Sequence, residues 1–378
     1  MLTVEQARLC VTGFDHNRPA NFPGLGDFIG WARGIERAPN GDLLLVHSAG
    51  YWHVSFATPR LFHQETRKKW DKEGWPIDYN APTGGRSMMT RSKNEGKTWS
   101  QPKPITDFPL DDSPVTLLTC LDKTILCFIN VQSSWYGFNQ APDMFKDDLA
   151  GLNTRQCVIR SIDGGESWSQ PLWFDSPGTF YERSHAQAIQ LPDGGILWPT
   201  YCADQGKKQL FGAIHRSDDS GLTWQTISTI HRRDLDVDEP AIARFESGLL
   251  VMVSRPDGGI FLSDDNGISW NESGQIVESG VLKAPRLIVL PDQTLVCIAT
   301  YQGSLHLFLN RGEVEQALNW TPISLDSSCY GYPGGRLMED GNLLVPYCES
   351  GRAPNRVYLI RLRIHIHDDR DSAEFLAI

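Results

Sequence analysis

An eight-residue turn, Ser-x-Asp/Asn-x-Gly-x-Ser/Thr-Trp, constrains the fold of this chain more than any other feature, because it occurs four times. The copies begin and end at Ser92 and Trp99, Ser161 and Trp168, Ser217 and Trp224, and Ser263 and Trp270. The Asp or Asn can accept hydrogen bonds from the backbone of its own turn, and the Gly supplies a positive φ. The Trp then re-enters a strand as a large apolar side chain. Four such turns predict a repeated β-hairpin unit.

A second repeat lies between these turns and consists of an apolar strand, a turn that usually contains Gly, and another apolar strand. Its copies cover residues 38–45, 191–197, 245–250, 290–295 and 338–344, with a degenerate sixth over 120–126. No helical period separates them, so the chain is expected to be all-β. Six units of two hairpins each predict a six-bladed β-propeller with four-stranded antiparallel blades around a central channel.

The whole chain, residues 1–378, is interpreted as one propeller domain with two insertions, at 51–85 and 133–152. Long insertions on a rigid scaffold commonly shape a binding face. The segment 355–363 has the alternation of a strand, and either it or residues 9–14 is expected to close the ring.

Composition and charge narrow the possible partners. The chain is 40% apolar with a net charge of −11, which disfavours a nucleic-acid partner but allows a local basic pocket. No apolar run approaches the ~20 residues of a membrane span, and the N-terminus lacks the pattern of a signal peptide. The expectation is a soluble cytoplasmic protein, or a secreted one if a signal was removed. Its oligomeric state is left open.

Cysteine and histidine positions do not predict a metal centre or a disulfide framework. The eight cysteines form no Cys-x-x-Cys pair, and most lie in apolar strand-like runs, which favours reduced core thiols. His365 and His367 alternate along one probable strand and are interpreted as surface residues. No Gly-rich phosphate loop opens a helix, so no cofactor is expected.

The six turns allow equivalent positions to be compared within the chain. Counting nine residues back from the turn reaches Glu239 from Gly248, and Tyr332 from Gly341. The same count from Gly195 reaches Ala186, next to His185. In the other units it reaches residues that lie close in sequence to an ionisable residue. The channel mouth is therefore predicted to gather Arg33, His185, Asp238, Glu239, Lys283, Arg286 and Tyr332. Ionisable groups at the ends of apolar strands are candidates for chemistry.

These residues carry a family likeness. The octamer turns resemble the Asp-box, or bacterial neuraminidase repeat, of sialidases. The stretch 238–240, with Arg255 sixteen residues after Glu239, resembles the sialidase segment that holds the catalytic Glu and a carboxylate-binding Arg. Tyr332 and the residues after it are similar to the segment of the nucleophilic Tyr, and 33–35 resembles the first-blade Arg-Ile-Pro motif. His185 to Tyr201 is similar to the third-blade segment.

The resemblance implies a retaining glycoside hydrolase that releases a terminal sialic acid or a similar carboxylated sugar. It implies Tyr332 as nucleophile, Glu239 as its base, and Arg33, Arg255 and Arg286 as carboxylate binders, with His185 and Asp238 also at the substrate. A Tyr hydroxyl serves because a carboxylate nucleophile would repel the carboxylate of the substrate. A guanidinium suits that carboxylate because it can bind both oxygens.

Several positions depart from the family pattern. Gly34 interrupts the Arg-Ile-Pro motif, and the third arginine has two candidates, Arg286 and Arg311. The role of the acid that protonates the leaving oxygen is assigned to Asp78, with Asp71 nearby, although the surrounding sequence does not match the pattern of the family.

Two alternatives therefore stay open. One is a polysaccharide lyase, or another enzyme acting on uronate-containing glycans, that uses Tyr, His and Arg. The other is a propeller without catalytic activity that binds a glycan or a protein.

Overall fold

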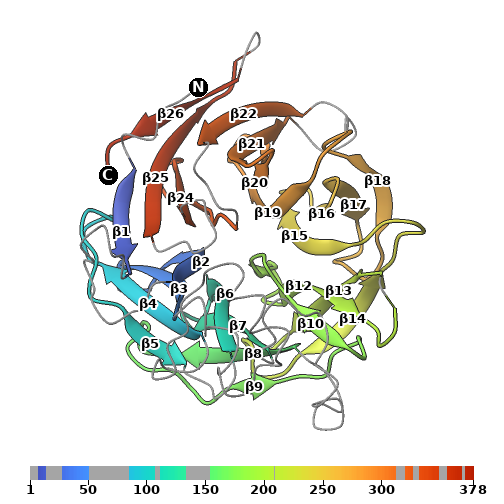
Figure 1. The fold of residues 1–378 in the computed structure, drawn as a ribbon, viewed down its shortest axis with the longest axis horizontal. Helices are drawn as coiled ribbons and strands as arrows, with labels where there is room; N and C mark the ends of the chain where they lie inside the picture. The colour runs from blue at the N-terminus through green and yellow to red at the C-terminus, as the bar shows by residue number, and fades with distance from the viewer. Residues whose placement is uncertain are drawn as a thin grey trace, which may run out of the picture.

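The structure is a computed structural model that forms a six-bladed β-propeller (Figure 1). It describes residues 7–13, 28–50, 85–106, 111–132, 154–207, 209–311, 320–326, 332–348, 356–367 and 371–378. All regular secondary structure within these ranges is β-strand, as the repeat predicted. No helix in this part of the chain is long and apolar enough to cross a bilayer. Both insertions predicted from the sequence lie almost wholly outside the described residues, and so does Asp78.

The first three blades follow the chain from the N-terminal third onward. Blade 1 contains β2 (Phe28–Arg37), β3 (Leu43–Gly50), β4 (Arg86–Ser92) and β5 (Lys103–Thr106). Blade 2 contains β6 (Asp111–Thr119), β7 (Ile125–Gln132), β8 (Thr154–Ser161) and β9 (Leu172–Trp173). Blade 3 has a divided inner strand, β10 (Tyr181–Arg183) and β11 (Ile189–Gln190), followed by β12 (Ile196–Ala203), β13 (Phe211–Ser217) and β14 (Gln225–Ile230).

The remaining blades complete the ring. Blade 4 contains β15 (Asp238–Arg244), β16 (Leu250–Arg255), β17 (Gly259–Ser263) and β18 (Asn271–Gln275). Blade 5 contains β19 (Leu282–Val289), β20 (Leu295–Tyr301), β21 (Ser304–Asn310) and β22 (Thr321–Asp326). Blade 6 contains β23 (Arg336–Leu337), β24 (Leu343–Cys348) and β25 (Arg356–His365), together with β1 (Arg8–Thr12) and β26 (Ser372–Leu376).

Strands from both ends of the chain close the ring in blade 6. The antiparallel pairing of β1 with β25 places Arg8 opposite Leu359, and β26 pairs with the following part of β25. Figure 1 shows the blue β1 beside the red β25. Both segments predicted to close the ring therefore take part. The unpaired edge of β25 is thereby covered, which a closed ring of blades requires.

The six turns after the inner strands share one backbone pattern. In blade 4, Phe245 N–H donates to Leu249 O at 2.9 Å and Gly248 N–H donates to Phe245 O at 3.0 Å. The residue equivalent to Gly248 has positive φ in every blade: Gly41, Lys123, Gly194, Gly248, Gln293 and Gly341. The six predicted units are confirmed. In blade 3, however, the equivalent residue is Gly194 and not Gly195, so the count of nine reaches His185 itself.

The octamer turns form the hydrogen bonds that their sequence predicts. In blade 2, Ser161 Oγ donates to Asp163 Oδ1 at 2.7 Å, and Gly165 N–H donates to Ser161 Oγ at 2.8 Å. Ser167 N–H also donates to Asp163 Oδ1, at 3.0 Å. The other three turns repeat these bonds.

The octamer glycines also press against the preceding blade. A Cβ on Gly221 would lie 2.8 Å from Leu126 Cδ1 of blade 2, and one on Gly165 would lie 3.0 Å from Leu44 Cδ1 of blade 1. Gly96 and Gly267 approach Leu359 and Leu197 in the same way. Each octamer Trp packs against a hydrophobic cluster that both blades share. The repeat therefore joins adjacent blades as well as turning the chain.

The described cysteines are thiols buried in the core, as predicted: Cys10, Cys120, Cys127, Cys157, Cys202, Cys297 and Cys348. Cys329 lies outside the described residues. Burial raises the pKa of the Cys120 thiol to about 12, which keeps it protonated and unreactive.

Gly34 departs from the family motif for a steric reason. A Cβ at this position would lie 2.6 Å from Val46 Cγ2 and 2.9 Å from Thr116 Cα in blade 2. Inner strands β2 and β6 therefore pack too closely for a side chain here.

Gly34→Ala should lower the free energy of unfolding by about 1–3 kcal/mol, since the added methyl group overpacks the contact between blades 1 and 2. The matched control is Gly41→Asn in an open, exposed turn of the same blade, where φ is +91°. Because Asn tolerates positive φ, it should cost less than about 1 kcal/mol. Urea unfolding measures both variants, and wild-type stability in Gly34→Ala would contradict this account of the interface.

Candidate active site

The inner strands share a backbone distortion at the channel mouth. Trp31, Glu239, Ala284 and Tyr332 have φ values of 50°, 48°, 49° and 58°. In β2, β15 and β19 the pairing with the next strand shifts at the same place. Positive φ in residues other than Gly is uncommon and concentrates at functional sites, and a bulge re-aims the side chain that it carries. The distortion turns side chains from several blades toward the channel.

Glu239 is the anchored carboxylate of this mouth, and only 2% of its side chain is exposed. Arg255 Nη1 donates to its Oε1 at 3.1 Å, and Ala284 N–H donates to its Oε2 at 2.7 Å. Both oxygens therefore have a partner, one from its own blade and one from blade 5. A buried carboxylate with two donors is held in a fixed orientation.

Tyr332 lies between cationic and aromatic neighbours. The Arg33 guanidinium carbon is 5.3 Å from the centre of the Tyr332 ring, and the His185 ring centre is 4.8 Å from it. Desolvation and the negative charge of Glu239 raise the pKa of the Tyr332 phenol well above its usual range, although Arg255 and Arg33 oppose the shift. The phenol is therefore protonated at neutral pH and needs a base before it can act as a nucleophile.

His185 packs its ring between Tyr332 and Tyr201, whose ring centre lies 5.5 Å away in a stacked arrangement. Burial, followed by the charges of Arg33 and Arg183, lowers the pKa of His185 well below its usual value. The ring is consequently neutral at neutral pH. Its Nδ1 lies 3.6 Å from Glu239 Oε1, which is too long for a hydrogen bond and, with a neutral ring, is not a salt bridge.

Asp238 stands beside Glu239, and Arg255 Nε lies 3.5 Å from its Oδ2. Burial and the adjacent charge of Glu239 raise the pKa of Asp238 to about 8, and Arg255 limits this shift. A carboxyl group in a desolvated site ionises less easily beside a second carboxylate. Asp238 is therefore protonated at neutral pH.

Three arginines place positive charge at this mouth. Arg33 is buried and donates from Nη2 to Ser113 Oγ at 3.2 Å, while burial lowers its pKa to about 10. Arg255 holds the two adjacent carboxyl groups of Asp238 and Glu239. Arg183, at the end of β10, acts electrostatically on His185 and Asp238.

Sequence reasoning missed Arg183 and Tyr201, which come from the irregular third blade. Counting nine residues back from Gly194 rather than Gly195 would have placed His185 at the inner position and drawn attention to Arg183 two residues earlier. The divided inner strand of this blade hid that register.

Two other predicted arginines lie elsewhere. Arg286 lines a cavity together with Glu36, Arg244 and Arg336, and it donates from Nη2 to Thr116 Oγ1 at 3.2 Å. Arg311 pairs with Asp371 of the final hairpin. Arg183 is therefore a second candidate for the carboxylate-binding role that the sequence predicted for Arg286.

Residues 135–345, more than half of the chain, match the family described as the BNR repeat-like domain. The chain therefore belongs to the BNR repeat-like family. The match covers the last three octamer turns and the segments of Glu239 and Tyr332. The sequence-based identification of sialidase-like propeller repeats is confirmed.

One curated relative is similar over part of its length. The chain is 24% identical over 227 residues to a sialidase of Bacteroides fragilis (strain YCH46), a match that covers 56% of this chain and 39% of the relative. The chain thus corresponds to well under half of that protein.

Solved structures with the same fold include a sialidase and an arabinanase. A protein of unknown function from Dyadobacter fermentans has a TM-score of 0.72 at 18% identity, with 94% of this chain and 99% of that chain covered. The NanB sialidase of Streptococcus pneumoniae has a TM-score of 0.65 at 11% identity, with 94% of this chain and 70% of that chain covered. An alpha-L-arabinanase of Penicillium chrysogenum, solved with arabinobiose, has a TM-score of 0.61 at 16% identity, with 93% of this chain and 97% of that chain covered. At these identities the likeness establishes the fold alone.

Asp238→Asn should become more stable relative to wild type as pH rises. The folded carboxyl keeps its proton up to about pH 8, whereas the unfolded chain releases it near 3.8, so wild-type stability falls through this window. The slope approaches about 1.4 kcal/mol per pH unit. Urea unfolding at several pH values measures it, with Asp292→Asn in an exposed turn as control. A constant difference between wild type and Asp238→Asn would contradict the raised pKa.

Proposed function

We propose that this protein is a retaining glycoside hydrolase of sialidase type that acts on a terminal sialic acid or a similar carboxylated sugar. The observation that carries the proposal is the arrangement at the mouth: a protonated Tyr332 beside Arg33, with the buried carboxylate of Glu239 held by Arg255 and Ala284 N–H. Family membership and the sialidases among the similar proteins support it.

The proposed reaction begins when Tyr332 Oη attacks the anomeric carbon as Glu239 accepts the phenol proton. The bond from this carbon to the leaving oxygen breaks, and a covalent glycosyl–tyrosine intermediate forms. Water then releases the sugar with retention of configuration, and Tyr332 regains its proton. A neutral phenol suits this attack, because the substrate carboxylate on the same carbon would repel a carboxylate nucleophile.

The substrate carboxylate is proposed to pair with Arg33, Arg255 and Arg183. Arg33 packs against Tyr332, and Arg183 acts electrostatically on His185 and Asp238, so both add positive charge where such a group would bind. Buried guanidinium groups bind carboxylates strongly because little water competes for the same hydrogen bonds.

The acid that protonates the leaving oxygen remains the proposed Asp78, which lies outside the described residues. Asp238 is a second candidate, because its raised pKa leaves a proton to donate at neutral pH.

A uronate lyase is the second candidate function, favoured by the neutral His185 ring packed against Tyr332. In that reaction a base removes the proton beside the uronate carboxylate, and the glycosidic bond breaks to leave an unsaturated sugar. An absorbance rise on uronate glycans, without release from a sialoside, would favour this activity. Glycan binding without either reaction would favour the non-catalytic alternative.

Tyr332→Phe should lower kcat on a fluorogenic aryl sialoside by at least about a hundredfold, since removing the hydroxyl removes the nucleophile and its proton transfer. Tyr358→Phe, in the outer part of blade 6, is the matched control and should keep wild-type kcat. No release by wild type where a known sialidase is active, or full activity in Tyr332→Phe, would overturn the proposal. An arabinan oligosaccharide as substrate tests whether the protein shares the activity of the structurally similar arabinanase.

Arg183→Gln should lower kcat/KM for the same sialoside about ten- to hundredfold, because a charged hydrogen bond to the carboxylate contributes about 1.5–3 kcal/mol. The matched control is Arg216→Gln in the same blade, where Arg216 pairs with Asp193 and Asp218 at the outer edge. If Arg183→Gln and Arg216→Gln behave alike, Arg183 does not bind the substrate.

A further inference from the structure

A cavity of about 360 Å³ lies between the inner strands, and all six blades contribute to it. We call it the lower cavity. Its polar lining comes from Glu36, Gln187, Gln190, Arg244, Arg286 and Arg336.

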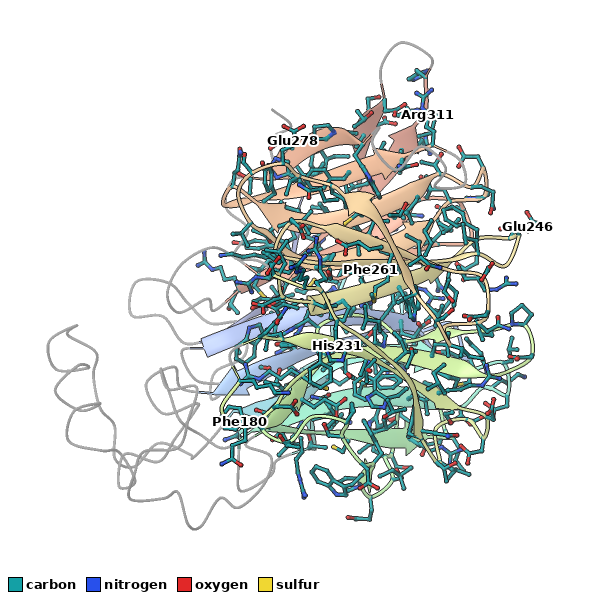
Figure 2. All side chains as sticks on the ribbon, turned by 90° about the vertical axis from the view of Figure 1, so that its right-hand side faces the viewer. Phe180, His231, Glu246, Phe261, Glu278 and Arg311 are labelled. Atoms are coloured by element: carbon teal, nitrogen blue, oxygen red, sulfur yellow. The ribbon has the colours of Figure 1, made fainter. Side chains whose placement is uncertain are left out.

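The lower cavity lies toward the opposite end of the inner strands from Tyr332. Its lining residues come later in the parallel-running inner strands: Glu36 follows Arg33, and Arg244 follows Glu239. Figure 2 shows the two faces at the ends of the channel, with Phe180 before β10 on one side and Glu246 after β15 on the other. The cavity is therefore separate from the proposed active site.

Arg286 reaches across the channel at the head of this cavity. It extends from blade 5 to donate from Nη2 to Thr116 Oγ1 of blade 2 at 3.2 Å, and 3% of the residue is exposed. Within the described part of the chain, its Nε and Nη1 have no hydrogen-bond partner. Burial lowers its pKa to about 9, the negative charge of Glu36 opposes this shift and Arg33 adds to it, so the group is still charged at neutral pH. A buried charge with open donors is costly unless an acceptor binds there.

The other charges of the cavity leave a positive surplus. Arg336 pairs with Glu36, whose pKa burial raises, so one arginine offsets one carboxyl group. Arg286 and Arg244 remain, and Nε of Arg244 and of Arg336 also lack partners among the described residues. Gln187 is fixed nearby by a 2.6 Å bond from its Nε2 to Leu287 O. The donor set is that of an anion site, since guanidinium N–H groups cannot accept hydrogen bonds.

We propose that the lower cavity binds a small multivalent oxyanion, of the class that includes inorganic phosphate and sulfate. The ligand accepts hydrogen bonds from Arg286 and Arg244 and neutralises the charge that Arg286 carries beneath Arg33. This site is independent of the reaction proposed at Tyr332.

Titration calorimetry with inorganic phosphate, at constant ionic strength set by chloride, tests the proposal. Wild type should bind phosphate with a dissociation constant of about 1 mM or tighter. Arg244→Gln should weaken binding at least about tenfold, because it removes a charged donor. Arg216→Gln at the outer edge of blade 3 is the matched control and should bind as wild type does.

Two further variants distinguish this cavity from the channel mouth and from misfolding. Glu36→Gln should tighten phosphate binding, because it removes a negative charge from the cavity, and a misfolded protein would not show this gain. Arg255→Gln removes positive charge from the mouth and should leave phosphate affinity within about twofold of wild type. Undetectable binding by wild type, unchanged affinity in Arg244→Gln, or loss of binding in Arg255→Gln would each overturn the proposal.

Discussion

Packing between adjacent blades is the constraint on which the rest of this structure depends. Each octamer turn presses a glycine against a leucine of the preceding blade and packs its Trp on the shared apolar cluster. The pairing of β1 with β25 joins the first and last parts of the ring. A closed ring holds six inner strands in fixed positions around one channel, so residues far apart in the chain can meet there with defined geometry.

The channel mouth shows what this rigidity allows. Glu239 reaches from blade 4 to the backbone of Ala284 in blade 5, and Tyr332 of blade 6 contacts His185 of blade 3. Because these groups are desolvated, each charge changes the proton affinity of its neighbours. Asp238 keeps a proton, His185 loses one, and Tyr332 remains a neutral phenol beside a carboxylate base. Such separation of proton affinities is a feature of sites that perform acid–base chemistry.

The two ends of the channel are coupled electrostatically, because the charge of Arg33 acts on Arg286. Arg33 lies over the Tyr332 ring, whereas Glu36 acts electrostatically on Arg286, and the charge of Arg33 lowers the pKa of Arg286. Blade 2 anchors both side chains: Ser113 accepts a hydrogen bond from Arg33 of blade 1, and Thr116 accepts one from Arg286 of blade 5. An anion in the lower cavity would reduce the repulsion between these arginines, which makes the two sites electrostatic neighbours without a shared ligand.

The sequence by itself determined the fold, the six units and most of the mouth, because turns with Gly, Asp and Trp act locally and mark the register of each blade. Counting from these turns reached Glu239 and Tyr332 directly. Only the tertiary structure decided which arginines meet them. Arg33 and Arg286 each lie two residues after a positive-φ residue, yet Arg33 packs against Tyr332 whereas Arg286 lines the lower cavity. Arg183 comes from an irregular strand. The direction of a long side chain depends on the packing of all six blades, and that packing is not encoded in any single turn.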